Sequence, residues 1–128
     1  MTKEIPDWSE KKILIAEDEF MGKKYLEKLL VSRRAKLQFA NNGEEAVRAV
    51  KNERFDMVLM DLKMPVKNGF DATMEIKELH PDLPVIAQTA LAYPADEDRA
   101  RACGCDDLVT KPFHKNELIS KMTRLIGS

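Results

Sequence analysis

The chain of 128 residues is 44% hydrophobic and 34% charged, which is the composition of one globular domain with its own core and excludes a disordered or fibrous protein. Its formal net charge is -1 and its Lys and Arg residues are spread along the whole chain, so it lacks the basic patch of a DNA- or RNA-binding surface. No apolar run approaches the roughly 20 residues of a membrane-spanning helix, so we expect no membrane insertion by this domain and a cytoplasmic location.

The first residues are polar and precede the first segment with a regular apolar pattern. We therefore expect residues 1–11 to be a linker and residues 12–128 to form the domain. Trp8 is the single tryptophan of the chain, and we expect it to pack on the flank of that domain.

Short apolar runs alternate with segments of helical periodicity from residue 12 onward. This pattern predicts strands at residues 12–16, 37–40, 57–60, 84–88 and 107–110. It predicts helices at residues 20–33, after the turn at 41–43, at 70–79, at 94–103 and over 118–126. Because crossover connections are right-handed, five strand-helix pairs in strict alternation require a mainly parallel sheet with helices on both faces.

Two of these helices carry a clear apolar stripe that should face the core. The stripes comprise Tyr25, Leu26, Leu29 and Leu30 in the first helix, and Leu118, Ile119, Met122, Leu125 and Ile126 in the last. Two other helix ends have a local signal. Pro81 stops the third helix, and Gly104 is the predicted left-handed residue after the fourth.

The stretch at residues 55–61 is the predicted centre of the domain. A continuous apolar run from Met57 to Met60 is typical of a strand that is buried on both faces of a parallel sheet, and it ends at Asp61. An ionised carboxylate at the mouth of a buried strand is costly unless a cation or hydrogen-bond donors meet it. Ligands of open α/β sheets bind at the edge formed by the carboxyl ends of the strands, so we expect Asp61 to be the residue that reacts.

The other predicted strands should bring further functional side chains to the same edge. Glu17 and Asp18 follow the first strand, Thr89 and Ala90 follow the fourth, and Lys111 follows the fifth. Three carboxylates repel one another unless a divalent cation lies between them, and Mg²⁺ prefers carboxylates, water and phosphate oxygens. A hydroxyl and a lysine suit phosphoryl oxygens. These residue types therefore predict a Mg²⁺-dependent aspartyl-phosphate site with Asp61 as the nucleophile.

Four motifs in this order resemble the receiver domain of two-component response regulators, over about residues 12–126. They are Ile-Ala-Glu-Asp at 15–18, Met-Asp-Leu-Lys-Met-Pro from residue 60 with Gly69, Thr89-Ala90, and Lys111-Pro112-Phe113. The Cys-Gly-Cys-Asp-Asp sequence at 103–107 is similar to receivers of hybrid sensor histidine kinases. The resemblance implies an α/β fold with a doubly wound five-stranded parallel sheet in the flavodoxin-like order 2-1-3-4-5.

The resemblance also implies a function for the acidic residues. Asp61 would accept a phosphoryl group from a phosphohistidine on a histidine kinase or a histidine phosphotransfer domain. Asp18, Asp61 and the backbone carbonyl of Lys63 would bind Mg²⁺, with Glu17 contributing through water. Such a domain is a phosphoacceptor and not an enzyme, beyond self-phosphorylation and self-dephosphorylation.

Thr89, the Ala90 amide and Lys111 would hold the phosphoryl oxygens, and a cis peptide bond before Pro112 would aim the lysine into the site. Many receivers carry Tyr or Phe three residues before this lysine, and the ring moves inward when the threonine turns toward the phosphoryl group. Leu108 has that position here, so the switch would consist of Thr89 and Leu108.

Lys63 lies two residues after the nucleophile and Leu91 two residues after Thr89. We expect both side chains to tune the lifetime of the aspartyl phosphate by crowding the approach of water.

Several alternatives stay open from the sequence. The chain is expected to be a fragment of a hybrid histidine kinase, whose cytoplasmic part could belong to a membrane-anchored sensor, with a stand-alone single-domain response regulator as the alternative. A pseudo-receiver is disfavoured because the nucleophile, the acids, Thr89 and Lys111 are all present. A Mg²⁺-dependent phosphatase of the haloacid dehalogenase type would carry a second Asp where Lys63 stands, and would need room for a substrate cap. The oligomeric state is left open.

The remaining metal-ligand types do not form a site by spacing. Cys103 and Cys105 flank one glycine, and His80 and His114 are remote from them in sequence. We expect the cysteines to be packing or surface thiols and the histidines to be surface residues.

Overall fold

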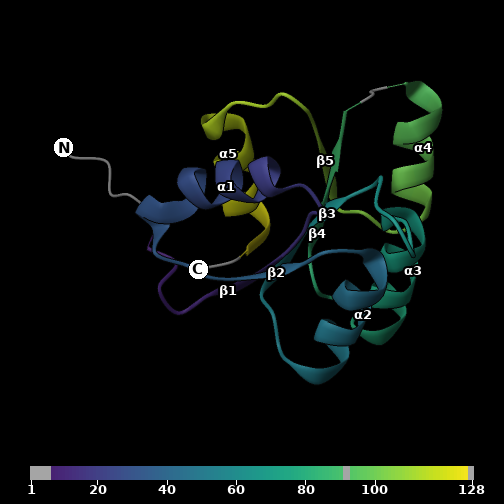
Figure 1. The fold of residues 1–128 in the computed structure, drawn as a ribbon, viewed down its shortest axis with the longest axis horizontal. Helices are drawn as coiled ribbons and strands as arrows, with labels where there is room; N and C mark the ends of the chain where they lie inside the picture. The colour runs from purple at the N-terminus through teal and green to yellow at the C-terminus, as the bar shows by residue number, and fades with distance from the viewer. Residues whose placement is uncertain (1–6, 91–92, 127–128) are drawn as a thin grey trace.

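The computed structural model describes residues 7–90 and 93–126. Strands and helices alternate along the chain, as Figure 1 shows. The elements are β1 (Lys12–Ala16), α1 (Phe20–Leu30), the short 3-10 helix η1 (Val31–Arg33), β2 (Lys36–Ala40), α2 (Gly43–Asn52), β3 (Met57–Asp61), α3 (Gly69–Leu79), β4 (Val85–Thr89), α4 (Pro94–Ala102), β5 (Asp107–Thr110) and α5 (Lys115–Ile126).

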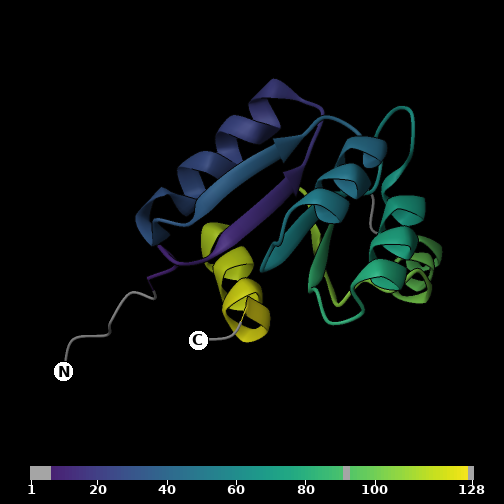
Figure 2. The same cartoon turned by 90° about the horizontal axis from the view of Figure 1, so that it is seen from below.

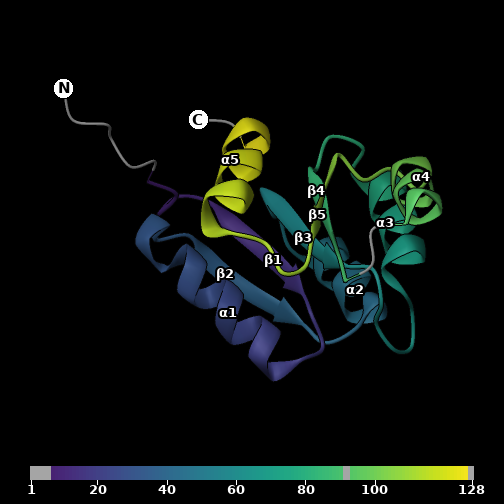
Figure 3. The ribbon, with the colours of Figure 1, turned by 90° about the horizontal axis from the view of Figure 1, so that it is seen from above.

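All neighbouring strands pair in parallel, and the sheet has the order β2-β1-β3-β4-β5. Helices α1 and α5 cover one face, and α2, α3 and α4 cover the other, as seen in Figure 2 and Figure 3. The predicted doubly wound α/β fold with strand order 2-1-3-4-5 is confirmed.

Alternating side chains of each strand enter the two hydrophobic layers. Ile13 and Ile15 of β1 belong to the cluster under α1 and α5, whereas Leu14 and Ala16 belong to the cluster under α2 and α3. Every residue of β3 is buried, because this strand lies in the middle of the sheet with helices on both sides. That burial explains the continuous apolar run in its sequence.

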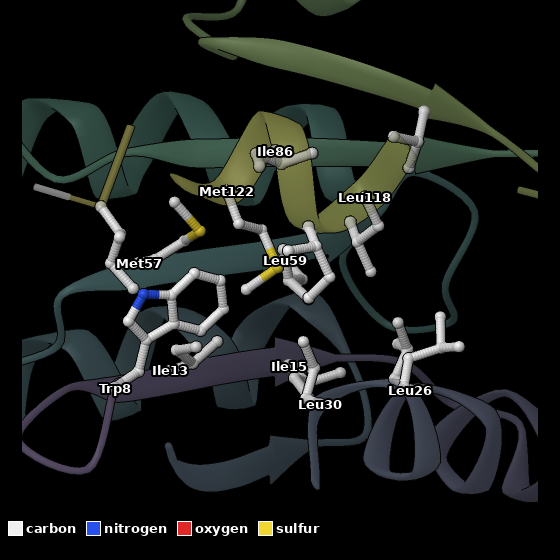
Figure 4. Close-up of a cluster of buried hydrophobic side chains, with 14 of the residues drawn as sticks. Trp8, Ile13, Ile15, Leu26, Leu30, Met57, Leu59, Ile86, Leu118 and Met122 are labelled. Carbon is white, nitrogen blue, oxygen red and sulfur yellow. The ribbon is translucent and has the colours of Figure 1, made fainter. Parts of the chain in front are cut away.

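Trp8 is part of the core and does not lie on the flank. Its side chain is 2% exposed and belongs to the cluster under α1 and α5, together with Met57 and Met122 (Figure 4). Its backbone N–H donates to the Arg33 carbonyl at 2.7 Å, and its carbonyl accepts from the Lys11 N–H at 2.8 Å. The expectation of a peripheral tryptophan was therefore wrong.

The first helix is shorter than the predicted 20–33. It ends at Leu30 and tightens into η1, after which Arg34 adopts a left-handed φ of 66°. Tyr25 also departs from the predicted stripe, since it is 43% exposed. Its hydroxyl donates to the Phe113 carbonyl at 2.6 Å, and a polar tip of this kind keeps a tyrosine at the rim of a core.

Local signals explain several helix ends. The Asn42 side chain accepts from the Glu45 N–H at 2.8 Å at the start of α2, and the Asn68 side chain accepts from the Asp71 N–H at 2.9 Å at the start of α3. Gly104 follows α4 with a φ of 109°, which confirms the predicted left-handed stop. Within residues 7–90 and 93–126, no helix has the length and apolar character to cross a membrane.

Candidate functional site

The parallel sheet brings the ends of four strands together at one edge. Asp61 is the last residue of β3 and Thr89 is the last of β4, while Glu17 follows β1 and Lys111 follows β5. Neighbouring strands are in register here, since Ala16 pairs with Met60, Asp61 with Gln88 and Thr89 with Thr110. The predicted residues are therefore assembled at the carboxyl edge.

Three acids at this edge form a compact cluster. Oxygen atoms of Glu17, Asp18 and Asp61 all lie within 4.8 Å of one another, and no other cluster of potential metal ligands occurs among the residues that the structure describes. Glu17 is 1% exposed and Asp61 is 6% exposed, whereas Asp18 is open to solvent. Burial first, and the neighbouring Asp61 carboxylate second, raise the pKa of Glu17 above its ordinary value.

Lys111 is the cation of this cluster. Its Nζ donates to Glu17 Oε1 at 2.9 Å and to Asp61 Oδ2 at 3.3 Å. Burial by itself would lower the pKa of Lys111, but the two carboxylates outweigh it and raise the pKa above the ordinary lysine value. The peptide bond between Lys111 and Pro112 is cis, as the resemblance implied. Lys111 therefore links the acids of β1 and β3 from across the sheet.

The donor set of the cluster suits a hard divalent cation. One ammonium group faces three carboxylates, so the edge keeps an excess of negative charge, and Mg²⁺ takes carboxylate oxygens together with water. Asp18 is exposed, which leaves a ligand that an ion can reach from solvent. The Lys63 N–H donates to Asp61 Oδ1 at 3.0 Å and orients that carboxylate. The Lys63 carbonyl as a metal ligand stays a prediction.

Two glycines make room for these acids, and the sequence patterns did not single out their role. A Cβ at Gly22 would lie 2.4 Å from Glu17 Oε1, and a Cβ at Gly69 would lie 2.3 Å from the backbone oxygen of Asp61. Gly22 is inside α1, where glycine costs about 1 kcal/mol relative to alanine. A glycine within the predicted helix at 20–33, here in the first turn of α1, is the signal that could have indicated a close approach.

Thr89 is buried at the end of β4, and its carbonyl accepts from the Lys111 N–H at 2.7 Å. Ala90 follows it and is exposed. Leu108 is opposite Ala87 in the sheet and packs in part against the cluster that contains Leu62 and Phe70. Leu91 lies outside the described residues.

The cysteines lie away from this edge, in the connection that leads into the amino end of β5. Cys103 is buried and its sulfur is 3.9 Å from that of Cys105. The hydrogen bond between the two thiols lowers the pKa of Cys103 to about 7.

The fold and the site define a doubly wound α/β protein with a cluster of three acids that could hold a metal ion at the carboxyl edge of its sheet. The family model of the response regulator receiver domain matches residues 13–123. The chain therefore belongs to the receiver domain family of two-component systems.

Individual relatives agree with this assignment. The chain is 36% identical over 121 residues to hybrid signal transduction histidine kinase G of Dictyostelium discoideum, covering 91% of this chain and 4% of that kinase. It is 30% identical over 116 residues to chemotaxis protein CheY of Halobacterium salinarum, covering 91% of this chain and 97% of the relative. The chain thus spans a small part of the kinase and almost the whole of the chemotaxis protein.

A solved structure gives the same result. The receiver domain of sensor histidine kinase PA1611 from Pseudomonas aeruginosa PAO1 superposes with a TM-score of 0.86 at 34% identity, over 92% of this chain and 98% of that domain. In that structure a magnesium ion is coordinated in the active site cleft.

Proposed function

We propose that Asp61 is the phosphoacceptor of this receiver domain and takes its phosphoryl group from a phosphohistidine on a histidine kinase or a histidine phosphotransfer domain. The observation that carries the proposal is the contact of Lys111 Nζ with both Glu17 and Asp61, at 2.9 and 3.3 Å, inside a three-carboxylate cluster. A nucleophile, a cation and an acidic metal site within one cluster are the parts that phosphoryl transfer to a carboxylate requires.

In the transfer, an Asp61 oxygen attacks phosphorus, a P–O bond forms and the P–N bond of the donor breaks. Its electron pair stays on the imidazole, which takes up a proton. Lys111 exchanges a carboxylate partner for a phosphoryl oxygen, and the Thr89 hydroxyl and the Ala90 N–H donate to the others. Mg²⁺ held by Asp18 and Asp61, with Glu17 acting through water and the Lys63 carbonyl as a further ligand, would neutralise phosphoryl charge.

The added charge would then bias the surface that a partner recognises. Thr89 and Leu108 are the proposed switch residues, because Thr89 would turn toward the phosphoryl group and Leu108 lies on the neighbouring strand. Lys63 and Leu91 would tune the phosphate lifetime. If Lys63→Ala and Leu91→Ala both left the dephosphorylation rate unchanged, the tuning role would be excluded.

The sequence left open whether the chain is part of a hybrid histidine kinase or a stand-alone response regulator. The relatives include a long hybrid kinase and a chemotaxis protein of nearly the same length as this chain. We propose a hybrid histidine kinase as the parent, on the basis of the Cys-Gly-Cys-Asp-Asp motif, with a stand-alone response regulator as the alternative. The cytoplasmic location stays a prediction.

Phosphoramidate tests the proposal because its P–N bond has the chemistry of phosphohistidine. After incubation with phosphoramidate and Mg²⁺, intact mass should show one added phosphoryl group on the wild type and none on Asp61→Asn. Asp82→Asn, at an exposed turn residue, is the matched control and should be modified like the wild type.

The other outcomes separate the alternatives. No adduct on the wild type would contradict the proposal and favour a pseudo-receiver. Continuous phosphate release from several phosphate esters would favour a phosphatase. Loss of the adduct when a chelator removes Mg²⁺ is expected, and an adduct that forms equally well without the metal would contradict the assigned role of the acids.

A further inference from the structure

Cys103 and Cys105 place two thiols side by side where α4 ends and the chain turns toward β5. They are the two cysteines of the chain, and both are free thiols in this structure. Their sulfur atoms are 3.9 Å apart. An S–S bond is about 2.0 Å long, so the sulfurs need to approach by roughly 2 Å to bond. The pair lies at the opposite end of β5 from Lys111 and is separate from the acidic cluster.

The backbone around the pair can accommodate this approach. Gly104 joins the two cysteines with a φ of 109°, and it has no side chain to hinder a change of its torsion angles. The Ala100 carbonyl accepts from Cys103 Sγ at 3.0 Å and from the Cys105 N–H at 3.1 Å. The thiol is the weaker of these two donors. When the Cys103 sulfur turns toward Cys105, the carbonyl therefore keeps its stronger partner and is not left unpaired.

A small oxidant can reach the pair. Cys103 is 7% exposed, and Cys105 is more exposed than Cys103. Ala102 and Asp106 on either side are open to solvent, so the connection between α4 and β5 is a surface segment. Such segments open locally at a low cost in free energy. Hydrogen peroxide is little larger than water, so it fits this site better than a bulky reagent.

The two thiols differ in acidity, which gives them different roles. The hydrogen bond between them lowers the pKa of Cys103 to about 7, and the same bond together with burial raises the pKa of Cys105. A thiolate and not a thiol is the nucleophile toward peroxide. Cys103 is therefore the sulfur that reacts first, and Cys105 is the sulfur that reacts with the oxidised Cys103.

We propose that Cys103 and Cys105 form a reversible redox site, which hydrogen peroxide oxidises to an intramolecular disulfide. The Cys103 sulfur attacks a peroxide oxygen, an S–O bond forms, the O–O bond breaks, and the hydroxide that leaves takes up a proton. Cys105 then loses its proton and attacks the Cys103 sulfur. The S–S bond forms, the S–O bond breaks and water leaves. In total the two thiols lose two electrons and two protons, and the peroxide is reduced to two waters.

The disulfide changes the packing at the end of α4. Cys103 belongs to the cluster that contains Leu62 and Ala87, and Cys105 packs against the same cluster. Closure withdraws the Cys103 sulfur from the Ala100 carbonyl in the last turn of the helix. A disulfide across one residue also closes a small, strained ring, and strained disulfides are the ones that thiols reduce readily. The site is therefore a reversible switch and not a permanent crosslink.

Peptide mapping of the whole, folded chain after treatment with hydrogen peroxide at pH 7 tests the proposal. Trypsin cleaves after Arg101 and after Lys115, so both cysteines stay in one peptide. In wild type this peptide should lose two hydrogen atoms, and dithiothreitol should restore them. Asp61→Asn should behave like wild type, so the result does not depend on the proposed phosphoacceptor.

The single-cysteine variants separate the two roles. Cys105→Ser should gain oxygen at Cys103 without losing hydrogen, because no second thiol is present. Cys103→Ser should react much more slowly. The wild-type result needs no variant, so the test stays decisive if a variant fails to fold. The proposal is overturned if the wild-type peptide gains oxygen without losing hydrogen, if it pairs between two chains, or if it reacts only after unfolding in urea.

Discussion

Glu17 is a buried carboxylate that faces a second carboxylate, and this arrangement opposes stability. Lys111 compensates for part of the repulsion through contacts with both acids. A site of this kind is stabilised further when a divalent cation binds, since the cation binds the folded state selectively. Folding stability in the absence of metal is thus lowered by the same residues that the proposed function needs.

Replacement of Glu17 tests this electrostatic account. The pKa of Glu17 is raised in the folded state, so the native protein binds more protons than the unfolded chain as pH rises above the ordinary value of 4.5. Its contribution to stability therefore falls through that window and stays low above it. We expect Glu17→Gln to be more stable than wild type at pH 7 without Mg²⁺, and the gain to shrink below pH 4.5.

Urea unfolding at pH 7 and below pH 4.5 measures this difference. Glu78→Gln, at an exposed position on α3, is the control and should match wild type under both conditions. If Glu17→Gln were less stable than wild type at pH 7, the stabilisation from the ion pair with Lys111 would exceed the cost of burying the Glu17 carboxylate, which contradicts this prediction.

At the level of elements, the junction between β3 and α3 holds Asp61, the proposed nucleophile, in place. The Gly69 N–H donates to the Leu62 carbonyl at 3.1 Å, and Gly69 lies directly against the Asp61 backbone. The helix therefore starts in contact with the strand that carries the proposed phosphoacceptor. A side chain at position 69 would have to displace backbone atoms and not a flexible side-chain end.

Gly69→Ala should consequently lower both stability and Mg²⁺ affinity. A Cβ would lie 2.3 Å from the Asp61 oxygen and 2.7 Å from the Leu62 Cα, so we expect a loss of about 1–3 kcal/mol in unfolding free energy. Gly104→Ala is the matched control, since its φ of 109° also makes alanine unfavourable but it lies beside Lys77, away from the acids. Equal Mg²⁺ affinity in Gly69→Ala and wild type would contradict the positioning role.

The order of elements could be predicted because it depends on local patterns. Buried strands are continuous apolar runs. Asp61, Thr89 and Lys111 stand where such runs end, so they could be predicted to lie at the carboxyl edge of the sheet. The contact between Glu17 and Lys111 could not be predicted from one segment of the sequence. The partners of Glu17, which are Asp61 and Lys111, lie 44 and 94 residues further along the chain.

For the whole molecule, Trp8 connects the segment before β1 to the main core. The surrounding sequence is polar, so its burial against Met57 and Met122 had no local signal. Trp8→Ala should lower the unfolding free energy by about 3–5 kcal/mol, because removal of a large aromatic side chain leaves a cavity in the core.

Urea unfolding followed by circular dichroism measures this cost. Val31→Ala, at an exposed position, is the control and should stay within about 0.5 kcal/mol of wild type. A loss below 1 kcal/mol for Trp8→Ala would place the tryptophan outside the cooperative unit.

The proposed function requires that the three carboxylates at one sheet edge hold a divalent cation beside Asp61. Its most direct test is the thermal unfolding midpoint as a function of Mg²⁺ concentration. We predict a saturable rise for wild type and for Asp82→Asn, and a Mg²⁺ affinity at least about tenfold lower for Asp18→Asn. A midpoint that does not respond to Mg²⁺, or an equal response of Asp18→Asn and wild type, would contradict the account.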